Sequence, residues 1–321
     1  MDTARLGRTD LELSRIGLGC GNFGGIGSAP ELFGRGETEE EAFALMDAAF
    51  AAGITFFDTA ASYGGGRSES WVGRWREERG APVLLSSKVY WPVSGDPDDK
   101  GLSRERILRE IEGSLRRLRT DRLDLYLTHE PDPETPIEET LRALDELVRA
   151  GKVRAFGASN VDEAQLVEAL EMSDRHGFAR YEWVQNEYNL LERGPEDGVL
   201  SVCEREGLGF TPFSPLAGGW LTGKYRHGEP YPIGSRMTLR GEPYAGFENE
   251  ETFAAIATFA NAAAERGVEP ATLAIAWLLS HPRVTAVVVG PRRPEQLDTA
   301  LAALELPLSL RECDELSNLF Q

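Results

Sequence analysis

The chain has 321 residues, 41% of them hydrophobic and 27% charged, which is typical of a soluble enzyme with a sizeable buried core. Its 34 lysine and arginine residues are outnumbered by 53 aspartate and glutamate residues, and the net charge is −19. This balance argues against nucleic acid or an anionic membrane surface as the main partner, although local cations can still hold an anionic ligand.

The predicted elements begin with a short hairpin, because Gly7 and Arg8-Thr9-Asp10 form a reasonable turn within residues 3–19. Apolar, β-branched runs then recur along the chain, and each is short enough to be a buried parallel strand. Eight such strands are predicted to end near Gly17, Asp58, Lys88, His129, Ser159, Gln185, Ser214 and Gly290.

Amphipathic helical patterns separate the predicted strands. Thr38 and Glu41 form a capping box for a helix over residues 38–52. Another helix is predicted to open at Thr135, with Pro136 in its first turn, and to end at Gly151. Further helices are expected near residues 68–79, 107–118, 161–172, 195–206, 250–266, 270–280 and 294–304, before a short terminal helix.

Eight alternating strand and helix units without a break in composition predict one α/β domain over residues 1–321. Its expected fold is a (β/α)8 TIM barrel with the hairpin as a plug in its floor. An open doubly wound sheet is the competing layout, but its ligand groups gather at a switch point. In this chain, polar residues stand at the ends of early, middle and late strands, which favours the barrel. Two long loops, 89–102 and 216–249, are expected over the active face.

Residues Gly19 to Gly24 match the pattern G-x-G-x-x-G of dinucleotide-binding folds. The context does not fit, because a Gly/Pro-rich stretch follows and no acidic residue ends a second strand about 20 residues on. We interpret this segment as a glycine-rich loop at which the backbone approaches a ligand.

Four polar residues, Asp58, Tyr63, Lys88 and His129, fall at predicted strand ends or in the loops that follow them. Taken singly, each has a structural interpretation. Asp58 could cap a turn and Tyr63 could be a half-buried aromatic residue. Lys88 could form an ion pair with Asp58, and His129 could be a core histidine. Taken together, they occupy the face on which barrel enzymes keep their chemistry. A phenol, an ammonium, a carboxylate and an imidazole can move a proton to or from a carbonyl oxygen.

The ordered motifs of the chain resemble those of the aldo-keto reductases over nearly its whole length. The resemblance rests on FFDTAASYGGGRSESWVG, the lysine that ends the third strand, and DLYLTH at the end of the fourth. It continues with GASN at 157–160, WVQNEYNLL at 183–191 and SPLAGGWLTGKY at 214–225. The family likeness implies that Tyr63 is the general acid or base, that Lys88 lowers its pKa, that Asp58 holds Lys88, and that His129 orients the carbonyl.

The same resemblance implies a nicotinamide cofactor, with NADP(H) expected and NAD(H) as the alternative. Phe213 occupies a position that is often tyrosine in the family, and Thr299-Ala300 replace a Glu-Asn pair that contacts adenine in many members. Arg292 and Arg236 are the expected partners of a 2′-phosphate. The full set of expected cofactor residues is Gly21, Asn22, Ser159, Asn160, Gln185, Phe213, Ser214, Leu216, Gly218, Arg236, Gly290, Arg292 and Gln296.

The expected substrate is a small carbonyl compound, or a sugar or polyol. Many members have tryptophan directly after the histidine, whereas this chain has Glu130, which would make the pocket rim more polar. Aromatic walls suit many carbonyl compounds and also stack on sugar rings. The candidate pocket residues are Phe23, Tyr90, Trp91, Glu130 and Trp220.

The competing functions are an NAD-dependent sugar dehydrogenase of the same fold and a regulatory subunit that resembles potassium-channel β subunits. A metal enzyme is not expected, because the four histidines share no ligand spacing. Three scattered cysteines, no signal-like start and no apolar run of membrane-spanning length predict a cytoplasmic protein, a monomer or a simple homo-oligomer. Neither the natural substrate nor the direction of reaction follows from these patterns.

Overall fold

Parallel strands form the centre of the structure, a computed structural model that describes residues 1–94, 96 and 98–320. Within these residues one sheet has eight strands in the order β10-β3-β4-β5-β6-β7-β8-β9. Hydrogen bonds from Thr285 N to Phe210 O and from Val288 N to Pro212 O join its two edges. The strands are β3 (Ile16–Gly19), β4 (Phe56–Asp58), β5 (Leu84–Val89), β6 (Leu123–Thr128), β7 (Val153–Ser159), β8 (Trp183–Gln185), β9 (Gly209–Phe210) and β10 (Val287–Val289).

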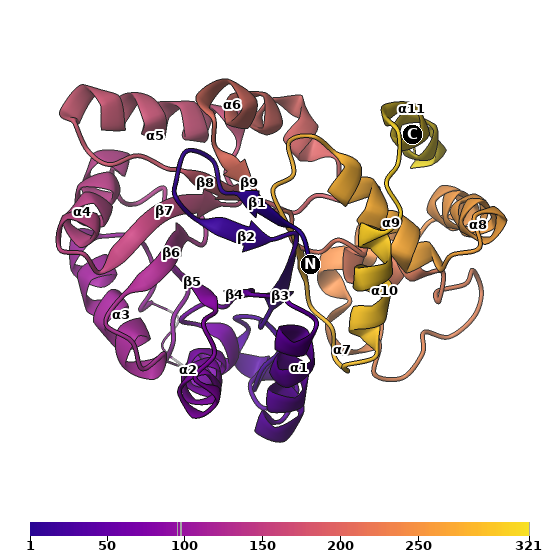
Figure 1. Cartoon of the computed structure of the whole chain (residues 1–321), viewed down its shortest axis with the longest axis horizontal. Coiled ribbons are helices and arrows are strands. Elements are labelled where there is room, and N and C mark those ends of the chain that lie inside the picture. The colour runs from indigo at the N-terminus through magenta and orange to yellow at the C-terminus, as the bar shows by residue number, and fades with distance from the viewer. Residues whose placement is uncertain (95, 97, 321) are drawn as a thin grey trace.

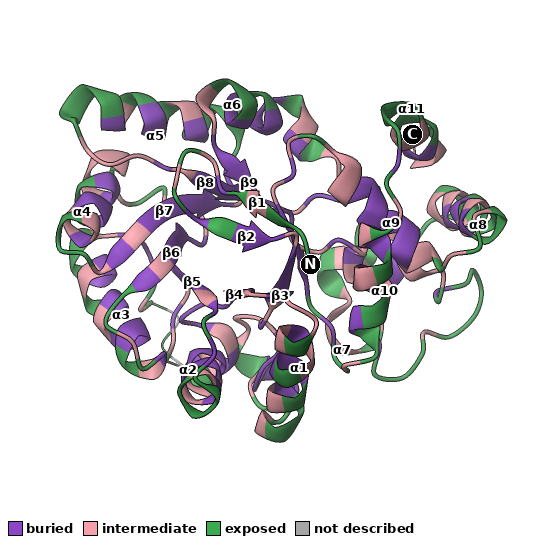
Figure 2. Ribbon diagram, in the orientation of Figure 1, coloured by how far each residue is buried: buried purple, intermediate pink, exposed green. Residues whose placement is uncertain are grey.

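Helices surround the strands, and Figure 1 shows them on the outside of the ring, as the predicted (β/α)8 TIM barrel requires. Figure 2 shows that their buried residues lie on the sides that face the strands. The helices are α1 (Glu39–Ala51), α2 (Arg67–Arg79), α3 (Arg104–Arg117), α4 (Ile137–Arg149), α5 (Glu163–His176), α6 (Val199–Glu206), α7 (Arg236–Arg240), α8 (Glu250–Glu265), α9 (Pro270–Ser280), α10 (Gln296–Leu304) and α11 (Leu310–Ser317).

The predicted hairpin plug is confirmed. Strands β1 (Thr3–Arg5) and β2 (Glu12–Ser14) pair antiparallel and lie across one opening of the ring in Figure 1. Gly7 adopts the left-handed conformation in their turn (φ 53°), where a Cβ would lie 2.8 Å from Glu182 O. The hairpin leucines Leu6, Leu11 and Leu13 pack against inward-facing strand residues, among them Phe56, Leu125, Leu127 and Trp183.

Several element boundaries differ from the sequence prediction. The helix at α4 begins at Ile137 rather than Thr135, because Pro136 is its N-cap. Gly198 has a non-helical backbone (φ 147°), so the helix predicted over 195–206 divides into a 3₁₀ turn, Gly194–Asp197, and α6. The strand predicted to end near Ser214 ends at Phe210. The capping box of Thr38 and Glu41 at α1 is confirmed.

The long segment 216–249 contains more structure than its Gly/Pro content indicated. It forms 3₁₀ turns at Ala217–Thr222 and Glu242–Phe247, with α7 between them. Short turns of this kind bury too few residues for a periodic apolar pattern. In the other predicted loop, 89–102, Gly95 and Pro97 lie outside the described residues. None of the described helices is both long and apolar enough to cross a membrane.

Candidate active site

Asp58, Tyr63, Lys88 and His129 meet at the carboxyl ends of three neighbouring strands. Asp58 is the last residue of β4, Lys88 lies one residue before the end of β5, and His129 directly follows β6. Tyr63 begins a 3₁₀ turn, Tyr63–Gly66, a few residues after β4. Side chains two apart on a strand point the same way. Asp58 therefore follows the inward-facing Phe56 to the interior of the barrel.

A buried ion pair forms the base of this group. Lys88 Nζ donates to Asp58 Oδ2 at 2.6 Å and to Thr59 O at 2.9 Å. The side chains of Lys88 and Asp58 are only 1% and 5% exposed. Ser86 Oγ donates to the other carboxylate oxygen, Asp58 Oδ1, at 2.6 Å. Because both charges are paired and hydrogen-bonded, the ammonium can remain charged away from water.

The phenol of Tyr63 lies between the ammonium and the imidazole. Lys88 Nζ donates to Tyr63 OH at 3.3 Å, and His129 Nε2 lies 3.5 Å from the same oxygen. The Tyr63 and His129 rings meet edge to face with centroids 5.5 Å apart. A polar atom bound near Tyr63 OH would therefore meet a proton donor and a second hydrogen-bonding nitrogen.

The electrostatic balance at Tyr63 differs from the expected lowering of its pKa. Burial alone raises the pKa of the phenol, the Lys88 ammonium lowers it, Asp58 raises it, and the net direction is upward. Burial alone would lower the pKa of Lys88, but the charges and hydrogen bonds of Asp58 and Tyr63 together outweigh burial and raise it. Lys88 thus acts in the expected direction, yet burial has the larger effect and keeps the pKa of the phenol above its ordinary value.

His129 is neutral in this environment. Burial, followed by repulsion from Lys88, lowers its pKa well below the usual value for histidine. Its Nδ1 atom is buried and has no hydrogen-bond partner among the described residues. A neutral imidazole can donate from one nitrogen and accept at the other. It therefore suits hydrogen bonding to an uncharged oxygen.

The residues expected at the nicotinamide end surround the four-residue group. A Cβ at Gly21 would lie 3.6 Å from Tyr63 Cε2, so the glycine leaves that side of the phenol uncovered. Ser159 and Gln185 are paired neighbours on β7 and β8, and Gln185 Nε2 donates to Asp58 Oδ1 at 3.3 Å. Asn160 has φ 58° and donates from Nδ2 to His129 O and to Glu130 Oε1. These contacts tie the three amide and hydroxyl residues to the site.

A strained, glycine-rich backbone follows Phe213. Ser214 and Gly218 have positive φ angles of 52° and 64°. A Cβ at Gly218 would lie 2.7 Å from the ring of Tyr244, which excludes a side chain there. Backbone N–H groups in such turns form concave anion sites. Leu216 opens the same turn as the residue before Ala217–Thr222.

Cations gather beside this glycine-rich turn. The pKa of Lys224 is lowered by burial and then by Arg236 and Arg292, which indicates that the three charges lie close together. Arg236 donates to Asn22 Oδ1 at 3.0 Å, and Arg292 Nε donates to Glu37 Oε1 at 2.7 Å. Gln296 Oε1 accepts from Arg292 N, and Gly290 follows β10 directly. We name Lys224, Arg236 and Arg292 the cation cluster.

Two of the predicted pocket walls are buried side chains. Trp220 is 0% exposed and packs with Tyr225 and Tyr231 of segment 216–249 and with Phe253 of α8. Phe23 is 1% exposed. Their assignment as pocket walls stays a prediction, because an aromatic residue in a Gly-rich segment gives no sign of the direction in which it points.

The other predicted walls remain accessible. Tyr90 and Trp91 are half-buried and pack edge to face at 5.0 Å. Glu130 accepts hydrogen bonds from the side chains of Trp91 and Asn160, and burial raises its pKa. These residues flank His129 on the active face.

Sequence reasoning missed three residues that contact the site. Ser86 precedes Lys88 by two positions, so strand alternation alone could have identified it. Lys224 stood in the motif LTGKY but was not singled out. Glu37 carried no signal, because its partner Arg292 is 255 residues away.

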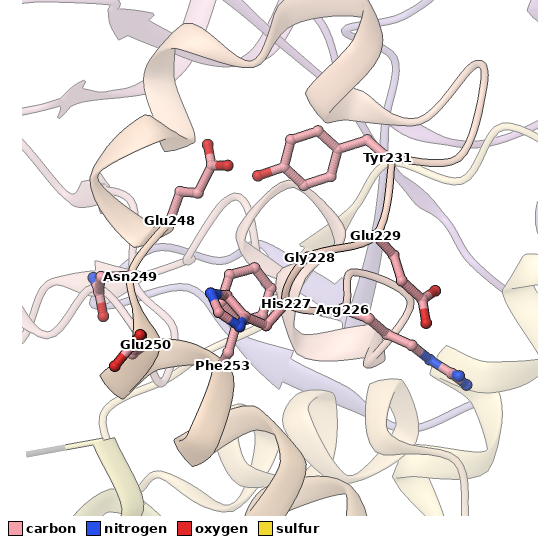
Figure 3. Close-up of a pocket in the computed structure, with 9 residues that line it drawn as sticks. All are labelled: Arg226, His227, Gly228, Glu229, Tyr231, Glu248, Asn249, Glu250 and Phe253. Atoms are coloured by element: carbon pink, nitrogen blue, oxygen red, sulfur yellow. The ribbon is translucent and has the colours of Figure 1, made fainter.

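A separate cavity of about 490 Å³ lies between segment 216–249 and the start of α8. In Figure 3, Tyr231 and Glu248 point toward each other across it. Burial and the nearby Glu248 raise the pKa of Tyr231 to about 12. The cavity is lined by Arg226, His227, Gly228, Glu229, Tyr231, Glu248, Asn249, Glu250 and Phe253. The group of Asp58, Tyr63, Lys88 and His129 contributes no residue to this lining. In the described part of the chain, no group of three His, Cys, Asp or Glu residues could hold a metal ion.

Glu187 makes folding dependent on pH. Burial, then repulsion from Glu192, raises the pKa of its carboxyl group from 4.5 to about 7, and Ser214 donates a hydrogen bond to it. The folded protein therefore holds this proton up to about pH 7, whereas the unfolded chain releases it near 4.5. Its contribution to stability is complete below pH 4.5 and is lost as the pH rises through about 7.

We expect the free energy of unfolding to fall by about 2 kcal/mol more in the wild type than in Glu187→Gln between about pH 5 and about pH 8. Urea unfolding at both pH values measures this difference. Glu192→Gln provides the matched control, because it should lower the pKa of Glu187 without removing the group. Equal pH dependence in the wild type and Glu187→Gln would contradict the prediction.

Comparison with known proteins identifies relatives along almost the full chain. A model of the aldo/keto reductase family matches residues 15–320. An uncharacterized oxidoreductase, YrpG of Bacillus subtilis, is 38% identical, with 100% of this chain and 96% of the relative covered. A probable voltage-gated potassium channel subunit beta of Oryza sativa is 36% identical (95% and 92% covered). Versiconal hemiacetal acetate reductase of Aspergillus parasiticus is 33% identical (97% and 95% covered).

Proposed function

The chain belongs to the aldo/keto reductase family, and from this membership we propose that it transfers a hydride between a nicotinamide cofactor and an aldehyde, a ketone or the corresponding alcohol. The family and the oxidoreductase relatives already support a carbonyl oxidoreductase. The observation that carries the finer proposal is the position of Tyr63 OH, 3.3 Å from Lys88 Nζ and 3.5 Å from His129 Nε2.

In the reducing direction, Tyr63 gives its proton to the carbonyl oxygen as that oxygen gains negative charge. Lys88 stabilises the phenolate that remains, and Asp58 keeps the ammonium in place. His129 donates a hydrogen bond that orients the same carbonyl oxygen. In the oxidising direction the phenolate takes the proton back, so the same four residues serve both directions.

The residues present fit a dinucleotide. When bound, the nicotinamide supplies or accepts the hydride, which no side chain can do. The cation cluster and the positive-φ turn at Ser214 and Gly218 suit its phosphates, and Ser159, Asn160 and Gln185 suit its carboxamide. We propose NADP(H) as the main cofactor, with Arg292 and Arg236 toward the 2′-phosphate, and NAD(H) as a second one.

Mixing purified protein with NADPH or NADH and a panel of aldehydes and ketones tests the proposal. Loss of reduced-nicotinamide absorbance should follow substrate addition. The channel-subunit relative supports a second candidate, a regulatory subunit. Tight cofactor binding without turnover over the whole panel would favour that candidate. Binding of neither cofactor would contradict both. We also propose that residues 1–321 form one domain and that the protein is cytoplasmic.

We propose that Glu130 favours substrates that carry hydroxyl groups. Its carboxylate uses two of about four acceptor positions on Trp91 and Asn160, which leaves positions for substrate hydroxyl groups beside His129. A hydrogen bond to a charged group contributes about 1.5–3 kcal/mol. For Glu130→Gln we therefore expect KM for glyceraldehyde to rise about tenfold.

Steady-state kinetics with matched substrates checks this expectation. Benzaldehyde has no hydroxyl group to bind, so its KM should change less than about threefold in Glu130→Gln. A parallel rise for both aldehydes would mean that Glu130 shapes the site without selecting substrates.

A further inference from the structure

Glu37 is a buried carboxylate within the proposed adenine end of the cofactor site. Its side chain is 2% exposed. Its backbone is fixed on both sides, since Glu37 N donates to Asn22 O and Gly24 N donates to Glu37 O. Gly36 before it packs so closely that a Cβ would lie 1.9 Å from Asn22 O. The carboxylate therefore has little freedom to move away from its partner.

That partner is Arg292 of the cation cluster. Arg292 Nε donates to Glu37 Oε1 at 2.7 Å, and its NH1 donates to Gly234 O at 2.8 Å. The Arg292 side chain is 43% exposed, so its remaining donors can reach a ligand. The second carboxylate oxygen, Glu37 Oε2, is buried and has no hydrogen-bond partner among the described residues. Glu37 is thus the internal counter-ion of a group proposed to bind phosphate.

We propose that Glu37 sets cofactor specificity by weakening the preference for a 2′-phosphate, so that NAD(H) remains usable beside the main cofactor, NADP(H). A 2′-phosphate on Arg292 would bring about two negative charges toward a fixed carboxylate in a poorly hydrated place. A 2′-hydroxyl brings none. Lys224 attracts both cofactors through their shared phosphates, whereas repulsion from Glu37 applies most strongly to the 2′-phosphate, which only NADP(H) carries.

The inference rests on the proposed function, because it assumes that a nicotinamide dinucleotide binds here. It differs from a positioning role in a measurable way. In Glu37→Gln the amide oxygen can still accept from Arg292 Nε, so the arginine stays oriented while the negative charge is lost. If Glu37 only positioned Arg292, this variant would bind 2′-phosphates no better than the wild type.

Isothermal titration calorimetry with adenosine 2′,5′-bisphosphate and with 5′-AMP tests the inference without turnover. We expect Glu37→Gln to bind the bisphosphate about tenfold more tightly and 5′-AMP within about twofold of the wild type. Glu40→Gln removes the same charge from an exposed residue of α1 and should change neither affinity by more than about twofold. Glu37→Asp keeps the charge and should resemble the wild type.

The outcomes separate the two proposals. Unchanged or weaker binding of the bisphosphate by Glu37→Gln, in a variant that melts like the wild type, would overturn the role of Glu37. Equal tightening of both probes would do the same and leave the cofactor site intact. If Glu37→Gln does not fold, Glu37→Asp becomes the variant that tests the proposal. Its affinity for the bisphosphate must then stay near the wild-type value. A wild-type protein that binds neither probe would count against the cofactor site itself, and the inference would fall with it.

Discussion

Tyr63→Phe is expected to lower kcat for carbonyl reduction at least about a thousandfold, since it removes the proposed proton donor and leaves the ring in place. Tyr63 OH is the atom shared by Lys88 and His129, so no other hydroxyl occupies this position between the two nitrogens. Single-turnover measurement of reduced-nicotinamide absorbance gives the rate of the chemical step directly. The dissociation constant for NADPH, followed by tryptophan fluorescence, should change less than about threefold, because the phenol is not proposed to bind the cofactor.

Tyr126→Phe is the matched control for this prediction. It deletes a hydroxyl from the neighbouring strand β6, and that hydroxyl is buried without a hydrogen-bond partner among the described residues. Its kcat should stay within about twofold of the wild type. Turnover by Tyr63→Phe within tenfold of this control would remove Tyr63 from the chemistry and point to water or His129 as the proton donor.

The pKa of Tyr63 adds a direction to the expected pH dependence. Burial raises it above its usual value despite Lys88, so the phenol is protonated over the physiological range. Reduction, which needs the protonated form, should therefore proceed at neutral pH and decline only in alkali. Oxidation, which needs the phenolate, should speed up as the pH rises. This asymmetry follows from the environment of one residue and requires no second titrating group.

The sequence predicted this site as far as local patterns reach. Asp58, Lys88 and His129 could be placed because each ends or follows a short buried run, and parallel strands bring their carboxyl ends to one face. The pairing of Arg292 with Glu37 could not be predicted, because the two residues are 255 positions apart, in loops that follow the neighbouring strands β10 and β3. The direction of the pKa shift of Tyr63 could not be predicted either, because the burial of its phenol depends on all the residues packed around it.

The burial of Trp220 is another feature that the sequence pattern could not predict. Its segment has the glycines and prolines of an open loop, and a tryptophan in such a loop is a reasonable pocket wall. Instead, short helical turns fold around it, and Tyr225, Tyr231, Phe247 and Phe253 enclose its ring. These aromatic rings, from the segment and from α8, pack as part of the main hydrophobic core, which no spacing in the sequence reveals.

A second large effect is expected behind strand β5, where Glu69 of α2 is fully buried. Its carboxylate accepts from Arg117 Nε at 2.6 Å and from Ser87 Oγ at 2.5 Å. Burial alone would lower the pKa of Arg117, but Glu69, followed by Glu110, raises it, so the guanidinium stays charged. Ser87 directly precedes Lys88, so this network also supports the strand that carries the proposed catalytic ammonium.

Glu69→Ala should lower the free energy of unfolding by about 3–5 kcal/mol, because it leaves the half-buried charge of Arg117 with one partner fewer and opens a void beneath β5. Guanidinium chloride unfolding measures the loss. Glu77→Ala, on the same helix, breaks only an exposed ion pair with Arg119 and should cost less than about 1 kcal/mol. If both variants lost the same stability, the buried network would contribute no more than a surface pair, and β5 would owe its position to apolar packing alone.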